Sequence, residues 1–405
     1  MKPVGPIPPG YAAQDVLTVA GRTAAEWAEE GTPLYLYDFA VVAARVAGLR
    51  THLPDAVSLH YAVKANPYEP LVRALAPLVD GLDVASAGEL ALASRHKPAA
   101  AISFAGPGKR DFELEAAIQA GATLNLESEG EAERALAAGQ RLGVTPRLAV
   151  RVNPDFELRG SGMRMGGRAS PFGVDAARVP ALVKRLTAEG ADWRGFHIFA
   201  GSQSLDTAAI IETQAATVAL ARRLRDEAGA MPPLVNIGGG LGIPYFAGDM
   251  AVDVAAVGEA LGGVIETFPE TRFAIELGRY LVGEAGIYLT RVIDRKESQS
   301  ETFLVVDGGL HQHLAATGNF GMVVRRNYPV AVASRMANAG EETVSVVGPL
   351  CTPLDRLADK VVLPSAGVGD VIAIFASGAY GASASPSAFL GHAPVREVLA
   401  GIPHT

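Results

Sequence analysis

Short apolar segments rich in β-branched residues alternate with Ala- and Leu-rich segments over most of the chain, and this alternation restricts the folds that the sequence can adopt. The intervening segments, such as 129–142 and 205–227, carry apolar residues at helical spacing and mostly lack proline. The eight predicted strands cover residues 58–64, 82–86, 101–106, 123–128, 147–153, 195–201, 234–240 and 273–278. Eight strand–helix repeats in succession favour an α/β fold of the closed (β/α)8 TIM-barrel type over an open sheet.

The pattern of apolar and polar residues changes after about residue 280. Apolar and polar residues then alternate with a period of two in short segments that Gly and Pro separate. This pattern predicts an all-β, barrel-like C-terminal domain. The first residues are proline-rich and become extended at 33–39, so we expect them to add to that β domain. The predicted domains are an N-terminal extension over 1–36, a (β/α)8 barrel over 37–280 and a β domain over 281–405.

Composition and charge restrict the partners. Of the 405 residues, 49% are hydrophobic and the formal net charge is −8, so the chain can bury a large core and has no basic surplus for phosphates. Nucleic acid and anionic membranes are therefore not expected partners. The N-terminal ten residues contain four prolines and no apolar run, unlike a signal peptide. Residues 371–395 are uncharged, but Gly, Ser and Pro interrupt them, unlike a membrane helix.

The single cysteine, Cys351, excludes an internal disulfide and a cysteine-cluster metal site, and it fits a reducing compartment. We therefore expect a cytoplasmic protein. Composition alone favours a buried, inert thiol at this position. His311 and His313 form an H-x-H pair, but no third ligand accompanies them, so no metal site is predicted.

Polar residues cluster at the carboxyl ends of the predicted barrel strands, where the active sites of such barrels lie. Lys64 ends one strand, where packing is expected to desolvate its ammonium and to suit it for a Schiff base. Taken alone, the residue favours the alternative of a strand-end lysine reaching solvent. The complete set is Lys64, Asp83, Ser86, Glu127, Arg151, Asn153, Ser202, Gly238–Gly240, Glu276 and Arg279.

The glycine triplet 238–240 directly follows the seventh predicted strand, where bare backbone amides can approach a phosphate. A tight turn would explain the triplet equally well. Arg279 could donate to the same phosphate, and Glu276 could hold the ring nitrogen of a pyridine cofactor in its protonated form, which favours carbanion chemistry such as decarboxylation. A Glu276–Arg279 ion pair is the alternative for both residues. The loop 153–173 is long and glycine-rich, and it is interpreted as a lid or substrate loop rather than a disordered insertion.

Ordered motifs support one interpretation over nearly the whole chain. They are YAVKAN (61–66), LDVASAGEL (82–90), RVNP (151–154), AGSQ (200–203), GGGLGIPY (238–245), IELGRYLVG (275–283), VVDGG (305–309), GPLCTPLD (348–355) and GAYG (378–381). Together they resemble the fold-type III pyridoxal-phosphate decarboxylases, which include diaminopimelate decarboxylase and the eukaryotic-type ornithine decarboxylases. The resemblance implies pyridoxal 5'-phosphate as cofactor, a barrel of the alanine-racemase type and a homodimer with active sites at its interface.

The resemblance also implies a role for each matching residue. Lys64 would bind the cofactor covalently, Glu276 would pair with its ring nitrogen and Asp83 would support the Lys64 side of the site. Cys351, reaching the site from the second subunit, would protonate the carbanion left by CO2. The remaining implied cofactor contacts are Arg151, His197, Phe199, Ser202, Gly238, Gly239, Gly240, Arg279 and Tyr380, and the implied substrate contacts are Thr352 and Asp355.

Departures from the family pattern bear on the substrate. Phe199 replaces a histidine that usually stacks on the cofactor ring, while a histidine stands at His197. Thr352 replaces the acidic residue that anchors a distal amine, and LHQHLAATG (310–318) lacks the Arg-Pro pair of diaminopimelate enzymes. The motifs SGMRMGG, HIFAGSQ and GPLCTPLD resemble those of decarboxylases acting on carrier-protein-linked glutamate and of exosortase-associated decarboxylases. A tethered or side-chain-modified amino acid, presented on an acyl carrier protein, is therefore the expected substrate.

Three alternatives remain open at this stage. A decarboxylase of free diaminopimelate or a basic amino acid would need another anchor for the distal amine. An amino-acid racemase on the same fold conflicts with Glu276. A non-catalytic regulator that only binds pyridoxal phosphate would not need both Lys64 and Cys351.

Overall fold

The computed structural model describes residues 1–405 except 157–162, 165–166, 168, 323, 337–341 and 403–405. The chain forms two compact units. The β unit comprises residues 1–44, 243–250 and 279–405, and the barrel unit comprises 45–242 and 251–278. Among the helices of the described residues, none is long and apolar enough to cross a membrane.

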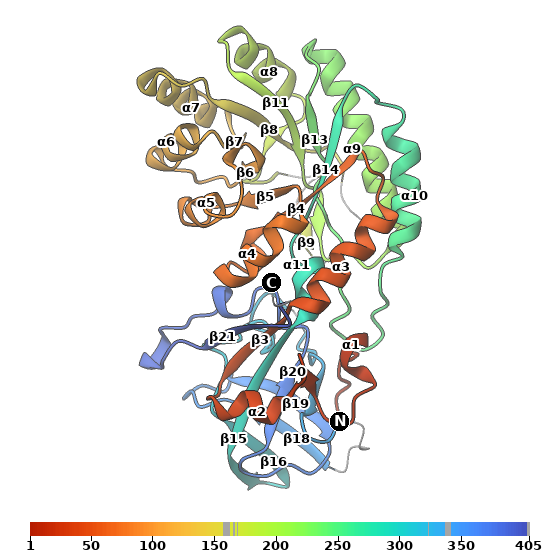
Figure 1. The fold of residues 1–405 in the computed structure, drawn as a ribbon, viewed down its shortest axis with the longest axis vertical. Coiled ribbons are helices and arrows are strands. Elements are labelled where there is room, and N and C mark those ends of the chain that lie inside the picture. The colour runs from red at the N-terminus through yellow and green to blue at the C-terminus, as the bar shows by residue number, and fades with distance from the viewer. Residues whose placement is uncertain (157–162, 165–166, 168, 323, 337–341, 403–405) are drawn as a thin grey trace. The chain divides into compact units, whose positions relative to one another are not determined.

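The barrel unit contains a closed parallel sheet (Figure 1). Its strands follow the order β8-β11-β13-β14-β4-β5-β6-β7, and β7 pairs with β8 to close the ring. This confirms the predicted (β/α)8 barrel. The strands are β4 (Val57–Ala62), β5 (Gly81–Val84), β6 (Ile102–Phe104), β7 (Thr123–Leu126), β8 (Arg147–Asn153), β11 (Asp192–Ile198), β13 (Leu234–Asn236) and β14 (Arg272–Leu277).

Several barrel helices begin at a residue whose side chain caps the helix, and two of them end at a glycine. Ser86, Ser128 and Asp206 accept backbone N–H bonds at the start of their helices, and Gly143 and Gly229 end theirs in the left-handed conformation. The helices flank the strands on the outside of the barrel (Figure 1). They are α4 (Glu69–Leu75), α5 (Ala87–Ser94), α6 (Asp111–Ala120), α7 (Glu129–Leu142), α8 (Val179–Ala188), α9 (Thr207–Ala228) and α10 (Val254–Ile265); α3 (Phe39–His52) links the two units.

The barrel interior is more polar than its apolar strand sequences suggest. His60, Asn125 and Asn236 are buried and, with small residues such as Ala149, line a cavity of about 250 Å³. Bulky branched side chains fill the interior of most TIM barrels. A polar cavity of this size is suited to ordered water.

The β unit is built on a mixed sheet of order β17-β20-β15-β16-β18-β19, and this confirms the predicted β domain. The N-terminal strand β3 (Leu34–Asp38) pairs with β15 and with the C-terminal strand β21 (Arg396–Ala400). The other strands are β15 (Gly286–Ser298), β16 (Glu301–Val306), β17 (Val330–Val332), β18 (Glu342–Val347), β19 (Arg356–Leu363) and β20 (Val371–Ile374).

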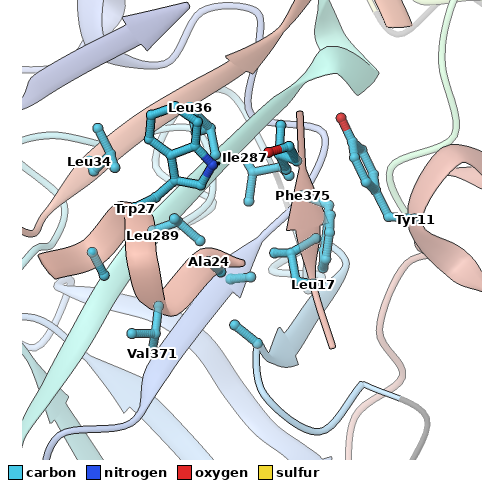
Figure 2. Close-up of a cluster of buried hydrophobic side chains, with 14 of the residues drawn as sticks. Tyr11, Leu17, Ala24, Trp27, Leu34, Leu36, Ile287, Leu289, Val371 and Phe375 are labelled. Atoms are coloured by element: carbon cyan, nitrogen blue, oxygen red, sulfur yellow. Dashed lines mark hydrogen bonds between the residues drawn. The ribbon is translucent and has the colours of Figure 1, made fainter. Parts of the chain in front are cut away.

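The N-terminal residues supply much of the core of the β unit. Trp27 of α2 (Ala24–Glu29) and Leu36 of β3 pack in one buried cluster with Ile287, Leu289 and Phe375 (Figure 2). Burying such side chains contributes roughly 1.5–3 kcal/mol each. Residues distant in the sequence therefore depend on each other for this core.

Candidate active site

Lys64 lies just beyond the end of β4, in the short 3-10 helix Val63–Ala65. Val63 and Ala65 are buried, whereas the Lys64 side chain is 46% exposed. The expectation that strand packing would desolvate this ammonium is wrong, because the backbone leaves the extended conformation one residue earlier. The Lys64 Nζ lies 3.8 Å from the Glu276 Oε1 and 5.6 Å from the centre of the Phe199 ring. The structure thus brings three predicted site residues together.

Glu276 occupies the carboxyl-terminal part of β14, and its side chain is only 4% exposed. Its Oε2 accepts a hydrogen bond from His197 Nε2 at 2.8 Å and a second from Asn236 Nδ2 at 3.2 Å. Burial alone would raise the pKa of Glu276, but His197, and then Lys64 and Arg151, outweigh burial and lower this pKa to about 2. Glu276 is therefore a carboxylate at neutral pH, able to hold a protonated nitrogen.

The glycine segment, residues 238–240, packs directly against β14. Gly238 has a φ of +72°, and its N–H donates to Asn236 Oδ1 at 2.9 Å. A Cβ at Gly239 would lie 2.0 Å from the backbone oxygen of Glu276. Gly240 has a φ of +89° and accepts a hydrogen bond from Ser204 N. Glycine is thus required here for close backbone approach as well as for turn geometry, and Ser202 lies nearby in the two-residue strand β12 (Gly201–Ser202).

Asp83 is the penultimate residue of β5 and lies beside a histidine that sequence reasoning missed. His60 Nδ1 lies 3.4 Å from Asp83 Oδ1, and both side chains are buried. Burial lowers the pKa of His60, but Asp83, with Glu276 and Asp80, raises it by more, so that the net pKa is above its ordinary value. The signal in the sequence was the position of His60 two residues before Ala62, on the inward face of an apolar strand.

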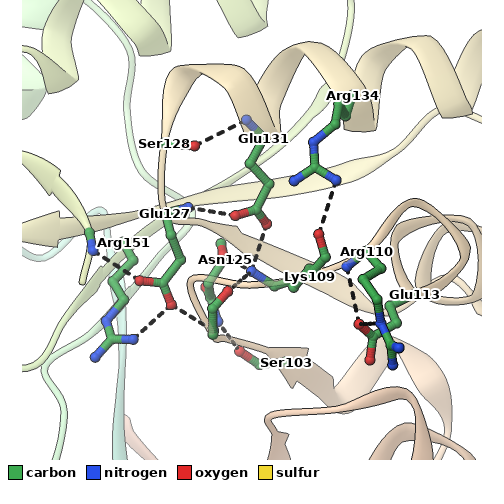
Figure 3. A network of polar contacts seen from close by, with 12 residues as sticks. Ser103, Lys109, Arg110, Glu113, Asn125, Glu127, Ser128, Glu131, Arg134 and Arg151 are labelled. Carbon is green, nitrogen blue, oxygen red and sulfur yellow. Dashed lines mark hydrogen bonds and ion pairs between the residues drawn. The ribbon is translucent and has the colours of Figure 1, made fainter. Parts of the chain in front are cut away.

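Arg151 is held in a buried ionic network at the ends of β7 and β8 (Figure 3). Glu127 Oε1 accepts hydrogen bonds from Arg151 at 2.7 Å and from Gly106 N at 2.6 Å, and its Oε2 accepts from Gly173 N at 2.9 Å. Burial would raise the pKa of Glu127, but Arg151 and Lys109 lower it by more, so the net pKa lies below its ordinary value. The network fixes Arg151 and one end of the predicted loop.

Lys109 and Glu131 complete this network, and neither was predicted to belong to the site. Lys109 Nζ donates to Glu131 Oε1 at 2.6 Å and to two backbone oxygens. Glu89 is a third residue that was not predicted to belong to the site. Its carboxylate accepts a hydrogen bond from Ala85 N and interacts electrostatically with Lys64. Burial raises the pKa of Glu89 despite both contacts.

The loop 153–173 lies partly outside the described residues, at 157–162, 165–166 and 168. Its described parts include β9 (Met163–Arg164), whose backbone pairs with β12 opposite Ser202. Residues Val174–Asp175, just after the loop, form β10 and pair with the end of β8.

Arg279 and Tyr380 come together within the β unit. The Arg279 guanidinium lies 4.7 Å from the centre of the Tyr380 ring and donates to the hydroxyl of Tyr245 at 2.9 Å. Burial lowers the pKa of Arg279, but Tyr245 and Tyr380 outweigh it and the pKa is raised. In the sequence Tyr245 is only the last residue of the motif GGGLGIPY, and the fold places it at this cluster.

Cys351 is exposed in the loop after β18, unlike the buried thiol that composition alone favours. Thr352 is half-buried beside it. Asp355 was predicted to bind substrate, but it is 3% exposed and accepts hydrogen bonds from Leu310 N at 2.6 Å and Leu350 N at 2.8 Å. Both carboxylate oxygens therefore help to hold the loop, and the substrate contact of Asp355 stays a prediction.

In the part of the chain that the structure describes, no group of three or more His, Cys, Asp or Glu side chains is placed to hold a metal ion. His313 Nε2 instead pairs with Ser377 Oγ at 2.8 Å, and burial lowers the pKa of His313 to about 3. His313 therefore belongs to the core of the β unit.

Comparison with known families identifies the family of this chain. Residues 40–283 match the model of the pyridoxal-binding domain of pyridoxal-dependent decarboxylases. The chain belongs to the pyridoxal-dependent decarboxylases. It is an enzyme whose cofactor is pyridoxal phosphate.

Similar proteins agree with this assignment. The chain is 37% identical to a Niallia circulans decarboxylase named for the L-glutamyl-BtrI acyl-carrier protein, over 91% of this chain and 88% of the relative. It is 31% identical to diaminopimelate decarboxylase of Aquifex aeolicus, over 87% and 82% of the two chains. The structure of M. jannaschii diaminopimelate decarboxylase with L-lysine superposes with a TM-score of 0.84 at 27% identity, covering 96% of this chain and 92% of that one.

The residues of the barrel unit fit this cofactor. The exposed amine of Lys64 suits an aldehyde, and the buried carboxylate of Glu276 suits a protonated ring nitrogen. Gly238 and Gly239 leave no room for a Cβ, and a segment of bare backbone is compatible with a phosphate site.

Proposed function

We propose that this pyridoxal-dependent decarboxylase removes the α-carboxylate of an acidic amino acid whose distal carboxyl is tied to a carrier protein. The observation that carries the proposal is the chemistry of the Cys351 loop. Thr352 is neutral, and the carboxylate of the neighbouring Asp355 is committed to two backbone amides. This loop therefore offers no free acid for the distal ammonium of diaminopimelate, lysine or ornithine. The relative named for a glutamyl carrier protein supports the same interpretation.

The proposed roles are those that the family resemblance implies, and the geometry of the residues supports them. Bound pyridoxal phosphate supplies the electron sink for the electron pair left when CO2 departs. Lys64 would hold the cofactor covalently through Nζ. Glu276 keeps a proton on the ring nitrogen, and the ring of Phe199 packs beside the Lys64 side of the site. Asp83 and its partner His60 support the same side.

Further residues complete the proposed site. Ser202, the glycine segment, Arg279 and Tyr380 bind the phosphate, and Arg151 is oriented for the site by Glu127. Cys351 donates the proton of its Sγ to Cα after CO2 has left. In the proposed homodimer this thiol comes from the second subunit. A cytoplasmic location belongs to the same proposal, because a single exposed thiol suits a reducing compartment.

The test is CO2 release by the cofactor-loaded enzyme on two parallel panels. One panel holds free glutamate, diaminopimelate, lysine and ornithine, and the other holds glutamyl groups loaded on a carrier protein. Turnover confined to the tethered substrates is the expected result. Fast release from free diaminopimelate would refute the argument from Thr352. Chiral analysis of the products separates decarboxylation from racemisation.

Thr352→Asp supplies a sharper version of the same test. A new carboxylate beside Cys351 should impair the tethered substrate and favour free diamino acids. Thr352→Ser keeps the hydroxyl and serves as the matched control. Increased activity of Thr352→Asp on the tethered substrate would show that the loop does not select against a distal charge.

A further inference from the structure

His197 lies in β11, inside the barrel and far from Glu276 in the sequence. Its neighbour across the sheet is Asn236 of β13, and Glu276 belongs to the next strand, β14. The side chain of His197 is 2% exposed and that of Glu276 is 4% exposed. The three polar groups therefore meet in a region that excludes bulk water.

The two oxygens of Glu276 face different partners. Oε1 is the oxygen nearer to the amine of Lys64, at 3.8 Å. Oε2 accepts the 2.8 Å bond from His197 Nε2 and the 3.2 Å bond from Asn236 Nδ2. The amide oxygen of Asn236 in turn accepts from Gly238 N at 2.9 Å. A carboxylate only accepts hydrogen bonds, so Nε2 must carry the hydrogen in the contact with His197.

We propose that His197 is a positioning residue that acts through Glu276. It holds Oε2 by donating Nε2–H, so that Oε1 is directed toward the cofactor ring nitrogen and the carboxylate keeps its charge. This role rests on the proposed role of Glu276 and adds to the cofactor contact predicted for His197. Asn236 alone would leave one longer, neutral hydrogen bond on a buried carboxylate, and several donors are needed to keep such a group ionised.

Four variants isolate the hydrogen bond. His197→Phe removes the donor but retains a ring, and His197→Asn retains an amide that is too short to reach. His197→Gln places an amide N–H near the position of Nε2. His313→Phe is the matched control, because it removes an equally buried imidazole that is bonded to Ser377 in the β unit.

The first readout is the titration of Glu276, followed by carboxyl-carbon NMR in the cofactor-free protein and assigned with Glu276→Gln. We expect His197→Phe and His197→Asn to raise the pKa of Glu276 by about one to two pH units, because a hydrogen bond to a charged group is lost. His197→Gln should recover most of that change, and His313→Phe should cause none. Should His197→Phe fail to fold, the comparison of His197→Asn with His197→Gln gives the same test.

The second readout is the nitrogen-15 shift of labelled pyridoxal phosphate bound to each variant. It should move toward the unprotonated ring in His197→Phe and return in His197→Gln. An unchanged Glu276 titration in folded His197→Phe and His197→Asn would overturn the proposal. Failure of the proposed substrate is distinguishable, because both spectroscopic readouts need no turnover.

Discussion

Gly239→Ala tests whether the glycine segment is required by packing. An added Cβ would lie 2.0 Å from the backbone oxygen of Glu276 and 3.0 Å from Leu277 Cδ2, both on β14. An ordinary contact begins at 3.4 Å, so the backbone must move by roughly 1.4 Å, the difference between 3.4 and 2.0 Å. The movement displaces either the glycine segment or the strand that carries Glu276.

The structure sets the size of the expected effect. Overpacking a rigid interior costs about 1–3 kcal/mol, and here the obstructing atoms are backbone rather than a flexible side chain. We expect the affinity for pyridoxal phosphate to fall by at least about tenfold, which corresponds to about 1.4 kcal/mol. Gly130→Ala in α7 is the matched control, because a Cβ there meets nothing within 4 Å.

The assay combines fluorescence titration of pyridoxal phosphate into the cofactor-free protein with urea unfolding of both variants. Gly130→Ala should bind normally and be as stable as the parent protein or slightly more so. If Gly239→Ala matched Gly130→Ala in both measurements, the packing argument would be refuted and the glycine triplet would be an ordinary turn.

Three further predictions concern single residues. Lys64→Ala should abolish the visible absorption band of the covalently bound cofactor, and a persistent band would exclude Lys64 as the attachment point. Asp355→Ala should lower the free energy of unfolding by about 2–6 kcal/mol, because two buried amides each lose an acceptor worth about 1–3 kcal/mol; a pure KM effect in a substrate titration would instead support substrate binding. Glu276 has its pKa lowered from 4.5 to about 2, so its contribution to stability is complete above pH 4.5 and disappears as the pH falls toward 2. Acid unfolding of Glu276→Gln should lack that pH-dependent loss, and identical acid profiles would contradict the assignment.

Local patterns in the sequence determined the architecture and the cofactor. Strand and helix periodicities are properties of neighbouring residues, so the alternation of segments predicted the (β/α)8 barrel before any contact was known. Ordered motifs around Lys64, the glycine segment and Glu276 indicated pyridoxal-phosphate decarboxylation, and the family comparison confirmed it. Capping residues such as Ser128 likewise act within one turn of a helix.

The tertiary structure decided which groups are paired, exposed or buried. His197 and Glu276 lie 79 residues apart and meet only because β11, β13 and β14 are adjacent in the closed ring. Asp355 has the same residue type as a substrate anchor, but its two amide donors make it part of the loop framework. Alternation of apolar and polar residues along a strand specifies the face on which each side chain lies. The partners of that side chain depend on the order of the strands and on closure of the barrel. Pairing in the barrel therefore required the three-dimensional structure, because charge and hydrogen bonding depend on distance rather than on position in the sequence.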